Sequence, residues 1–213
     1  MTFVARLLHG DLPADDAQAA LAFVAARPIY STVHLAAILG VLIATGGFVA
    51  LASTFTQPVT WLMGRVGSAA AVVGAAVYTV DFSTDGMSGA ELASKWQAAA
   101  PADKPAIVQS VATVFAALHG PSLIGISILW GLTLIVFGWA AIAARYPAWL
   151  GWLGVVAGAA TFLSATALFL WPNIFDGVVV YGLLVSLALL WSAALGITAW
   201  RRRGAVGDLE ALA

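Results

Sequence analysis

The chain has 213 residues, of which 62% are hydrophobic and only 9% are charged, and its formal net charge is −1. Soluble domains carry about 25% charged residues, so this composition indicates a membrane protein. The small net charge argues against a nucleic-acid partner, because phosphate binding needs a basic surface. The absence of cysteine excludes disulfides, thiolate metal sites and a cysteine nucleophile.

Residues 1–28 are predicted to form an N-terminal interfacial segment. Pro13 followed by Asp15 and Asp16 indicates a helix start, with acids near the positive end of the helix dipole. The helix expected over residues 15–27 has one apolar face but is too short and too polar to span a bilayer. We therefore expect it to lie on the membrane surface. The first ten residues lack the apolar run of a secretory signal.

Five apolar stretches follow, each of a length that crosses the hydrocarbon core, which takes about 20 helical residues. They cover residues 29–53, 58–80, 122–144, 148–171 and 177–200. The predicted fold class is therefore an all-α integral membrane protein, with a five-span domain over residues 29–200. Gly120-Pro121 is expected to break or kink the helix that leads from Pro105 into the third span.

The connection between the second and third spans, residues 81–104, is long and polar. Its Ser88 and Glu91 have the spacing of a capping box, in which each side chain bonds a backbone N–H at a helix start. This pattern predicts a short extracytoplasmic helix from Gly89 to about Ala99, before Pro101.

An odd number of spans places the two chain ends on opposite sides of the membrane. The side with residues 1–28, 81–104 and 172–176 has four Lys or Arg and eight Asp or Glu. The other side has five Arg, three of them in residues 201–203. Because Lys and Arg near span ends favour the cytoplasm, we predict an extracytoplasmic N-terminus and a cytoplasmic tail over residues 201–213.

Polar groups are predicted to gather at the outer membrane boundary. Counting back from the cytoplasmic span ends places His34, Asp81 and His119 near one level. Ionisable groups at this depth are costly and are usually paired or functional. Other polar residues are expected around these three: Asp85, Asn173, Asp176 and His9.

Two imidazoles and a carboxylate, from His34, His119 and Asp81, can hold a divalent metal ion with open coordination positions. Such a site would bind a small lipophilic ligand, or act on it through a metal-bound water with an Asp or His as proton acceptor; Asp81 and Asp85 are the catalytic candidates. A His–Asp pair could also move protons without a metal. As an alternative, His34 and His119 could be the two axial ligands of haem b in electron transfer. Local metal motifs such as HExxH are absent. The sequence leaves open whether the protein is an enzyme.

Structural roles for the same residues also stay open. His34 can be an interfacial hydrogen-bonding residue, and His119 can satisfy carbonyls freed by a kink. Asp81 can be a boundary charge, and Asp85 before Gly86 can be a turn residue. The protein would then be a non-enzymatic scaffold among membrane lipids.

The glycines Gly154 and Gly158 have the GxxxG spacing that allows close helix packing. This face is a candidate contact for a homo-oligomer.

Two stretches of the chain have a distinctive sequence. Residues 85–96 read Asp-Gly-Met-Ser-Gly-Ala-Glu-Leu-Ala-Ser-Lys-Trp, and residues 146–158 read Tyr-Pro-Ala-Trp-Leu-Gly-Trp-Leu-Gly-Val-Val-Ala-Gly. Both resemble small bacterial polytopic membrane proteins catalogued as domains of unknown function. The resemblance covers roughly residues 31–200 in the order and spacing of spans. It implies a compact helical bundle with an outward Asp-Gly loop, and it suggests that Asp85 and Trp96 belong to the group's pattern. It implies no activity.

Overall fold

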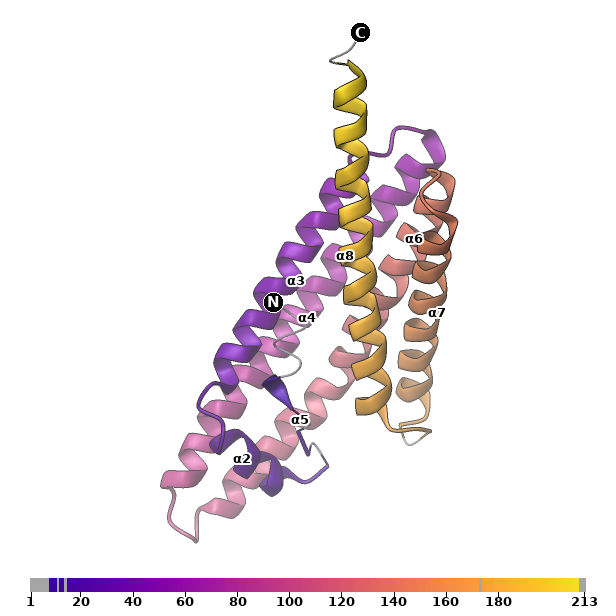
Figure 1. Cartoon of the computed structure of the whole chain (residues 1–213). Helices are drawn as coiled ribbons and strands as arrows, with labels where there is room; N and C mark the ends of the chain where they lie inside the picture. Colours follow the sequence, from indigo (N-terminus) through magenta and orange to yellow (C-terminus); the bar gives the residue numbers. More distant parts are fainter. Residues whose placement is uncertain (1–7, 11, 14, 173, 211–213) are drawn as a thin grey trace. The chain divides into compact units, whose positions relative to one another are not determined.

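The computed structural model describes residues 8–10, 12–13, 15–172 and 174–210, the side chains of 178 and 203–210 excepted. The described residues form helices and no strand (Figure 1). The helices are α2 (Ala17–Ala25), α3 (Tyr30–Ala52), α4 (Pro58–Ala98), α5 (Lys104–Ile126), the π-helix η1 (Ser127–Leu132), α6 (Thr133–Ala143), α7 (Ala148–Leu170) and α8 (Gly177–Glu210). The predicted site residue Asn173 lies outside the described residues.

Five helices in the described part of the chain are long and apolar enough to cross a membrane. They are Tyr30–Ala52, Pro58–Ala98, Lys104–Ala143, Ala148–Leu170 and Val179–Arg202. The all-helical fold class and five span-length helices are therefore confirmed. The surface position of α2 and the side of the membrane reached by each chain end stay predictions.

The structure differs from the sequence prediction over residues 81–104. α4 continues without a break for 41 residues, about 60 Å at 1.5 Å per residue. The separate helix predicted from Gly89, its capping box and the outward Asp-Gly loop are therefore wrong. Ser88 lies in the helix interior, and Glu91 instead accepts a hydrogen bond from Lys95, one turn on, at 2.6 Å. Gly86 and Gly89 each cost a helix only about 1 kcal/mol, which packing against α2 and α5 outweighs.

The chain also stays helical through Gly120-Pro121, so the predicted break does not occur. Pro121 lies inside α5, and η1 follows directly and leads into α6. The missing N–H of Pro121 leaves the carbonyl of Ala117 without its usual helical donor. One lost bond within a long packed helix is not enough to end it.

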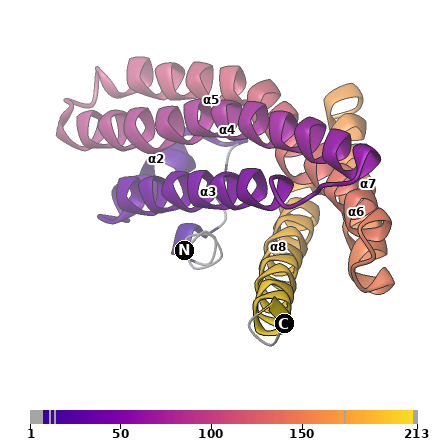
Figure 2. The ribbon, with the colours of Figure 1, turned by 90° about the horizontal axis from the view of Figure 1, so that it is seen from above.

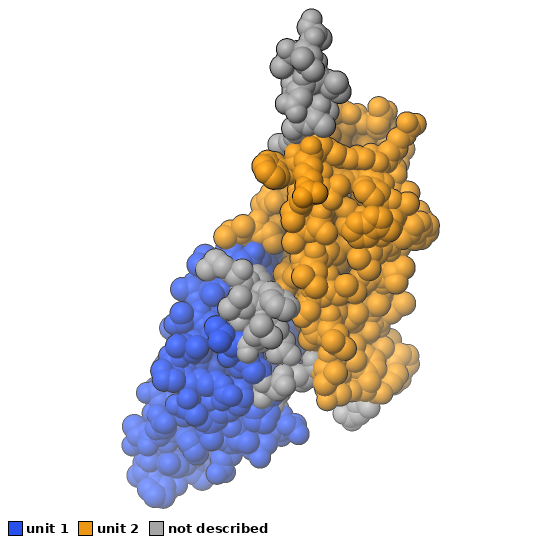
Figure 3. Space-filling model, viewed as in Figure 1, with its two compact units in different colours: residues 1–42, 75–125 blue, residues 43–74, 126–213 orange. Residues whose placement is uncertain are grey.

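The chain divides into two compact units (Figure 3). Unit 1 consists of residues 1–42 and 75–125, and unit 2 of residues 43–74 and 126–213. In unit 1, α2 packs its buried Leu21 and Val24 against Ala93 of α4 and Val111 of α5. The parts of α4 and α5 in this unit run alongside each other (Figure 2). This packing explains why the polar connection is helical and folded.

In unit 2, the GxxxG face of α7 meets helices of the same chain. A Cβ atom on Gly158 would lie 2.7 Å from the carbonyl oxygen of Gly131, and one on Gly154 would lie 2.4 Å from the Trp191 ring. Trp191 is buried, and its Nε1 donates to the carbonyl of Leu150 at 2.7 Å. Both glycines are therefore already used in close packing within the unit.

Candidate metal-binding site

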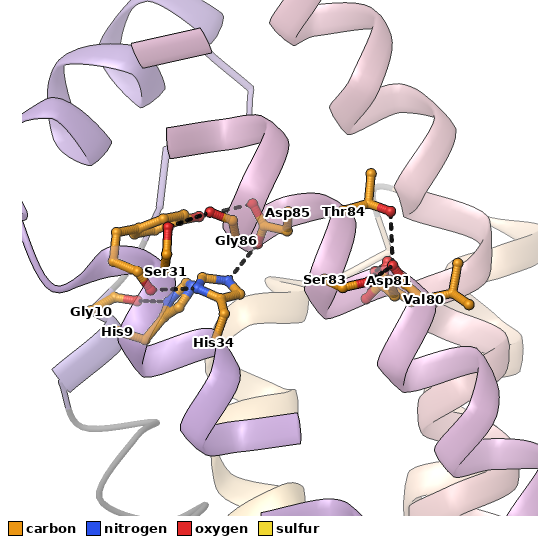
Figure 4. Close-up of polar contacts among 12 residues, drawn as sticks. His9, Gly10, Ser31, His34, Val80, Asp81, Ser83, Thr84, Asp85 and Gly86 are labelled. Carbon is orange, nitrogen blue, oxygen red and sulfur yellow. Dashed lines mark hydrogen bonds and ion pairs between the residues drawn. The ribbon is translucent and has the colours of Figure 1, made fainter. Parts of the chain in front are cut away.

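His34 is the buried centre of a polar cluster in unit 1, with 2% of its surface exposed. It lies one turn inside α3, where its Nδ1 donates to the carbonyl of Tyr30 at 2.9 Å. Its Nε2 lies 3.0 Å from Oδ2 of Asp85 on α4 (Figure 4). The imidazole therefore joins two helices and has both ring nitrogens engaged.

Gly86 allows α3 and α4 to approach at this point. A Cβ atom on Gly86 would lie 2.6 Å from Cβ of His34, a distance that real side chains do not tolerate. The hydroxyl of Ser31 donates to the carbonyl of Gly86 at 2.8 Å and fixes the same contact. The Asp85-Gly86 pair thus provides both a carboxylate and the space for the histidine that meets it.

The second oxygen of Asp85 is also occupied. The hydroxyl of Tyr30 donates to Oδ1 at 2.8 Å, and Tyr30 is 2% exposed. The ring centroid of His34 lies 4.4 Å from that of Tyr30 and 5.3 Å from that of Phe82. The carboxylate is therefore oriented by two donors beside an aromatic surface.

The hydrogen bonds of His34 indicate which ring nitrogen could bind a metal ion. The carbonyl of Tyr30 can only accept, so Nδ1 of His34 carries a hydrogen. Nε2 faces Asp85, and a metal ion bound at Nε2 would replace any hydrogen held in this contact.

His9 brings a second imidazole to the cluster from before α2. Its Nδ1 donates to the carbonyl of Gly10 at 2.7 Å, and its ring lies 4.9 Å from that of His34, between centroids. Gly10 has φ 70°, in the left-handed region that favours glycine. One ligand atom from each of His9, His34 and Asp85 lies within 4.8 Å of the other two.

This geometry is close to that of a metal site. Ligands of tetrahedral Zn²⁺ lie about 3.3 Å apart, given metal–ligand bonds of about 2.0–2.1 Å. The ligand atoms of His34 and Asp85 are already 3.0 Å apart. The ligand atom of His9 lies within 4.8 Å of both and would have to move closer to bind the same ion. Metal-ligating histidines commonly donate their other ring N–H to a backbone carbonyl, and both imidazoles here do so.

Asp81 lies outside this cluster. It is 5% exposed, and Ser122 of α5 places its Oγ 2.8 Å from both carboxylate oxygens. Figure 4 shows Asp81 apart from the two imidazoles. It is not among the three residues whose ligand atoms converge.

The remaining predicted site residues lie elsewhere. His119 is exposed on α5 and is not in the converging group. Asp176 belongs to unit 2, where it accepts from the backbone N–H of Val179 at the start of α8. The structure therefore brings together His34 with Asp85 and His9, not with Asp81 and His119. A haem iron at Nε2 of His34 would have to displace Asp85.

Comparisons of the chain with known protein families, with curated proteins and with solved structures give no match. The described part of the chain is helical, with five helices long and apolar enough to cross a membrane and a His/Asp group that could bind a metal ion.

Proposed function

We propose that the protein binds a divalent transition metal ion, Zn²⁺ in the first place, through His9, His34 and Asp85. The observation that carries the proposal is the convergence of their three ligand atoms within 4.8 Å. Each Nδ1 is held by a backbone carbonyl, so Nε2 is the ligating atom of both histidines. Imidazole and carboxylate ligands suit Zn²⁺ and related ions, and the chain offers no thiolate.

Three protein ligands leave a fourth position on a tetrahedral ion, which is the arrangement of catalytic rather than structural zinc sites. The ion would polarise a ligand or a water molecule bound there. Asp85 comes 27 residues after Pro58 on α4, whereas the hydrocarbon core takes about 20 helical residues. A span that begins near Pro58 would therefore end before Asp85, and we assign the site to the extracytoplasmic membrane boundary. A small lipophilic molecule could reach it from the bilayer.

The test is Zn²⁺ binding by the purified, chelator-treated protein, measured by calorimetry and metal analysis. We expect the parent protein to bind one ion per chain. His9→Ala and Asp85→Asn should each lower the Zn²⁺ affinity at least about tenfold, because loss of a residue that only supports a metal ligand already lowers metal affinity about 10–100-fold. His119→Ala is the matched control, because it removes an exposed imidazole outside the cluster. Equal losses in all three variants, or no binding by the parent protein, would refute the proposal.

A further inference from the structure

Asp81 and Ser122 form a second polar contact in unit 1, between the buried Asp81 of α4 and the half-buried Ser122 of α5. Ser122 Oγ lies 2.8 Å from each oxygen of Asp81, and the aspartate is 5% exposed. A serine hydroxyl has one hydrogen, whereas an ionised carboxylate can accept about four hydrogen bonds. One hydroxyl therefore solvates a carboxylate anion poorly.

The described cations of unit 1 are engaged with other partners. Arg27 lies over the ring of Phe23 at 3.3 Å and donates to its carbonyl. Lys95 pairs with Glu91. Lys104 lies over the ring of Trp96, 4.5 Å from its centroid.

Among the described residues, the titratable groups that act on Asp81 are Asp85, one turn further along α4, and His34 of α3. Nε2 of His34 already lies 3.0 Å from Oδ2 of Asp85, so the imidazole is engaged with another carboxylate. Burial of an unpaired carboxylate is avoided in proteins by protonation.

We propose that Asp81 is a neutral carboxylic acid, and that the Asp81–Ser122 contact is a proton-binding site separate from the metal cluster. In this state the Ser122 hydroxyl donates to the carbonyl oxygen of the acid, and the distance of 2.8 Å suits an O–H···O bond. The acid lies one helical turn from Asp85, about 6 Å along the axis. It is therefore placed to store a proton beside the cluster.

Infrared spectroscopy of the metal-free protein tests this directly. A protonated carboxyl group has a C=O stretching band apart from the amide bands, and we expect Asp81→Asn to lose such a band. Asp103→Asn is the control, because Asp103 is an exposed aspartate of the same unit. Ser122→Ala should keep the band but shift it, since the hydrogen bond is lost. An unchanged spectrum in a folded Asp81→Asn variant overturns the proposal, whatever the outcome of the metal titration.

Reaction with dicyclohexylcarbodiimide gives an independent readout. The carboxyl proton passes to a carbodiimide nitrogen, a carboxyl oxygen bonds to the central carbon, and rearrangement gives a stable N-acylurea without a leaving group. We expect peptide mass spectrometry to find the adduct on Asp81 and not on Asp103. An adduct on Asp85 with none on Asp81 contradicts the assignment.

Discussion

Gly86 sets the separation of α3 and α4 where His34 meets Asp85. The clash predicted for an added methyl group is with Cβ and Cγ of His34, at 2.6 and 2.8 Å, and neither atom is the end of a flexible chain. Three residues later, Gly89 has ordinary space, with its nearest atoms at 3.5 and 3.6 Å. The two glycines therefore form a matched pair for experiment.

We expect Gly86→Ala to lower the free energy of unfolding by about 1–3 kcal/mol, the usual cost of overpacking. It should also weaken Zn²⁺ binding, because His34 is displaced from Asp85. Gly89→Ala should leave stability unchanged or raise it by up to about 1 kcal/mol through helix propensity. Denaturant titration in detergent measures both variants, and equal behaviour would contradict the close approach.

Tyr30 holds Asp85 through a partly buried hydrogen bond to the carboxylate. Tyr30→Phe should cost about 1.5–3 kcal/mol, as for other hydrogen bonds to charged groups, because the half-buried carboxylate loses a donor. Tyr181→Phe is the control, since the Tyr181 hydroxyl is buried and has no hydrogen-bond partner among the described residues. Thermal unfolding of both variants checks the difference. A Tyr30→Phe protein as stable as Tyr181→Phe would show that the hydroxyl contributes nothing.

At the scale of the element, α4 decides where the site lies. A helix that began at Ser88 would have Gly89 at its first position, where proline is well tolerated. In the continuous α4, Gly89 is interior, and its proline ring would clash with the carbonyl of Asp85 one turn earlier.

We therefore expect Gly89→Pro to destabilise the protein by about 3 kcal/mol or more and to reduce Zn²⁺ binding. Circular dichroism during denaturant titration measures the first effect and calorimetry the second, with Gly89→Ala as reference. If the variant were as stable as the parent protein, the result would support a separate extracytoplasmic helix that begins at Gly89 and would contradict a continuous α4.

The sequence allowed prediction of the elements wherever one local property decides them. Hydropathy alone predicts the helices of span length. An apolar segment in hydrocarbon must satisfy its own backbone hydrogen bonds, and a helix does so. The prediction fails at residues 81–104, where Ser88 and Glu91 match a local cap pattern but α2 and α5 stabilise a longer helix. Tertiary packing, which a local pattern does not contain, decided that segment.

The candidate site was predictable to a smaller extent. The sequence identifies both His34 and Asp85 as candidates, but it indicates a turn position for Asp85, which the structure instead places on α4 facing α3. The contact of His9 with His34 depends on where α2 and the residues before it fold back, and no periodicity in the sequence encodes that. The depth of a residue along the membrane normal does not determine which helix faces meet. Depth alone therefore groups Asp81 and His119 with His34, although their side chains do not join the cluster.

At the scale of the whole molecule, the number of spans and the charges near their ends predict the membrane orientation. The chain lacks cysteine, so single cysteines can report the side of each turn. Asp103 in the α4–α5 turn and Gln57 in the α3–α4 turn are both exposed, and these two turns lie at opposite ends of α4.

We expect a membrane-impermeant maleimide to label Asp103→Cys in intact cells, and to label Gln57→Cys only after the membrane is opened. The reason is the excess of Arg near the span ends on the Gln57 side. Lysed cells, in which both should react, provide the control for reactivity. The reverse pattern would invert the orientation of the whole chain.

The position of His9 has a consequence for folding. His9 precedes α2, whereas Asp85 lies on α4, beyond both α2 and α3 in the chain, so an ion held by both residues would act as a reversible cross-link. It would close a long loop and thereby restrict the unfolded ensemble, as a disulfide does in other proteins. Because the chain has no cysteine, it cannot form a disulfide, and a bound metal ion would provide the cross-link instead.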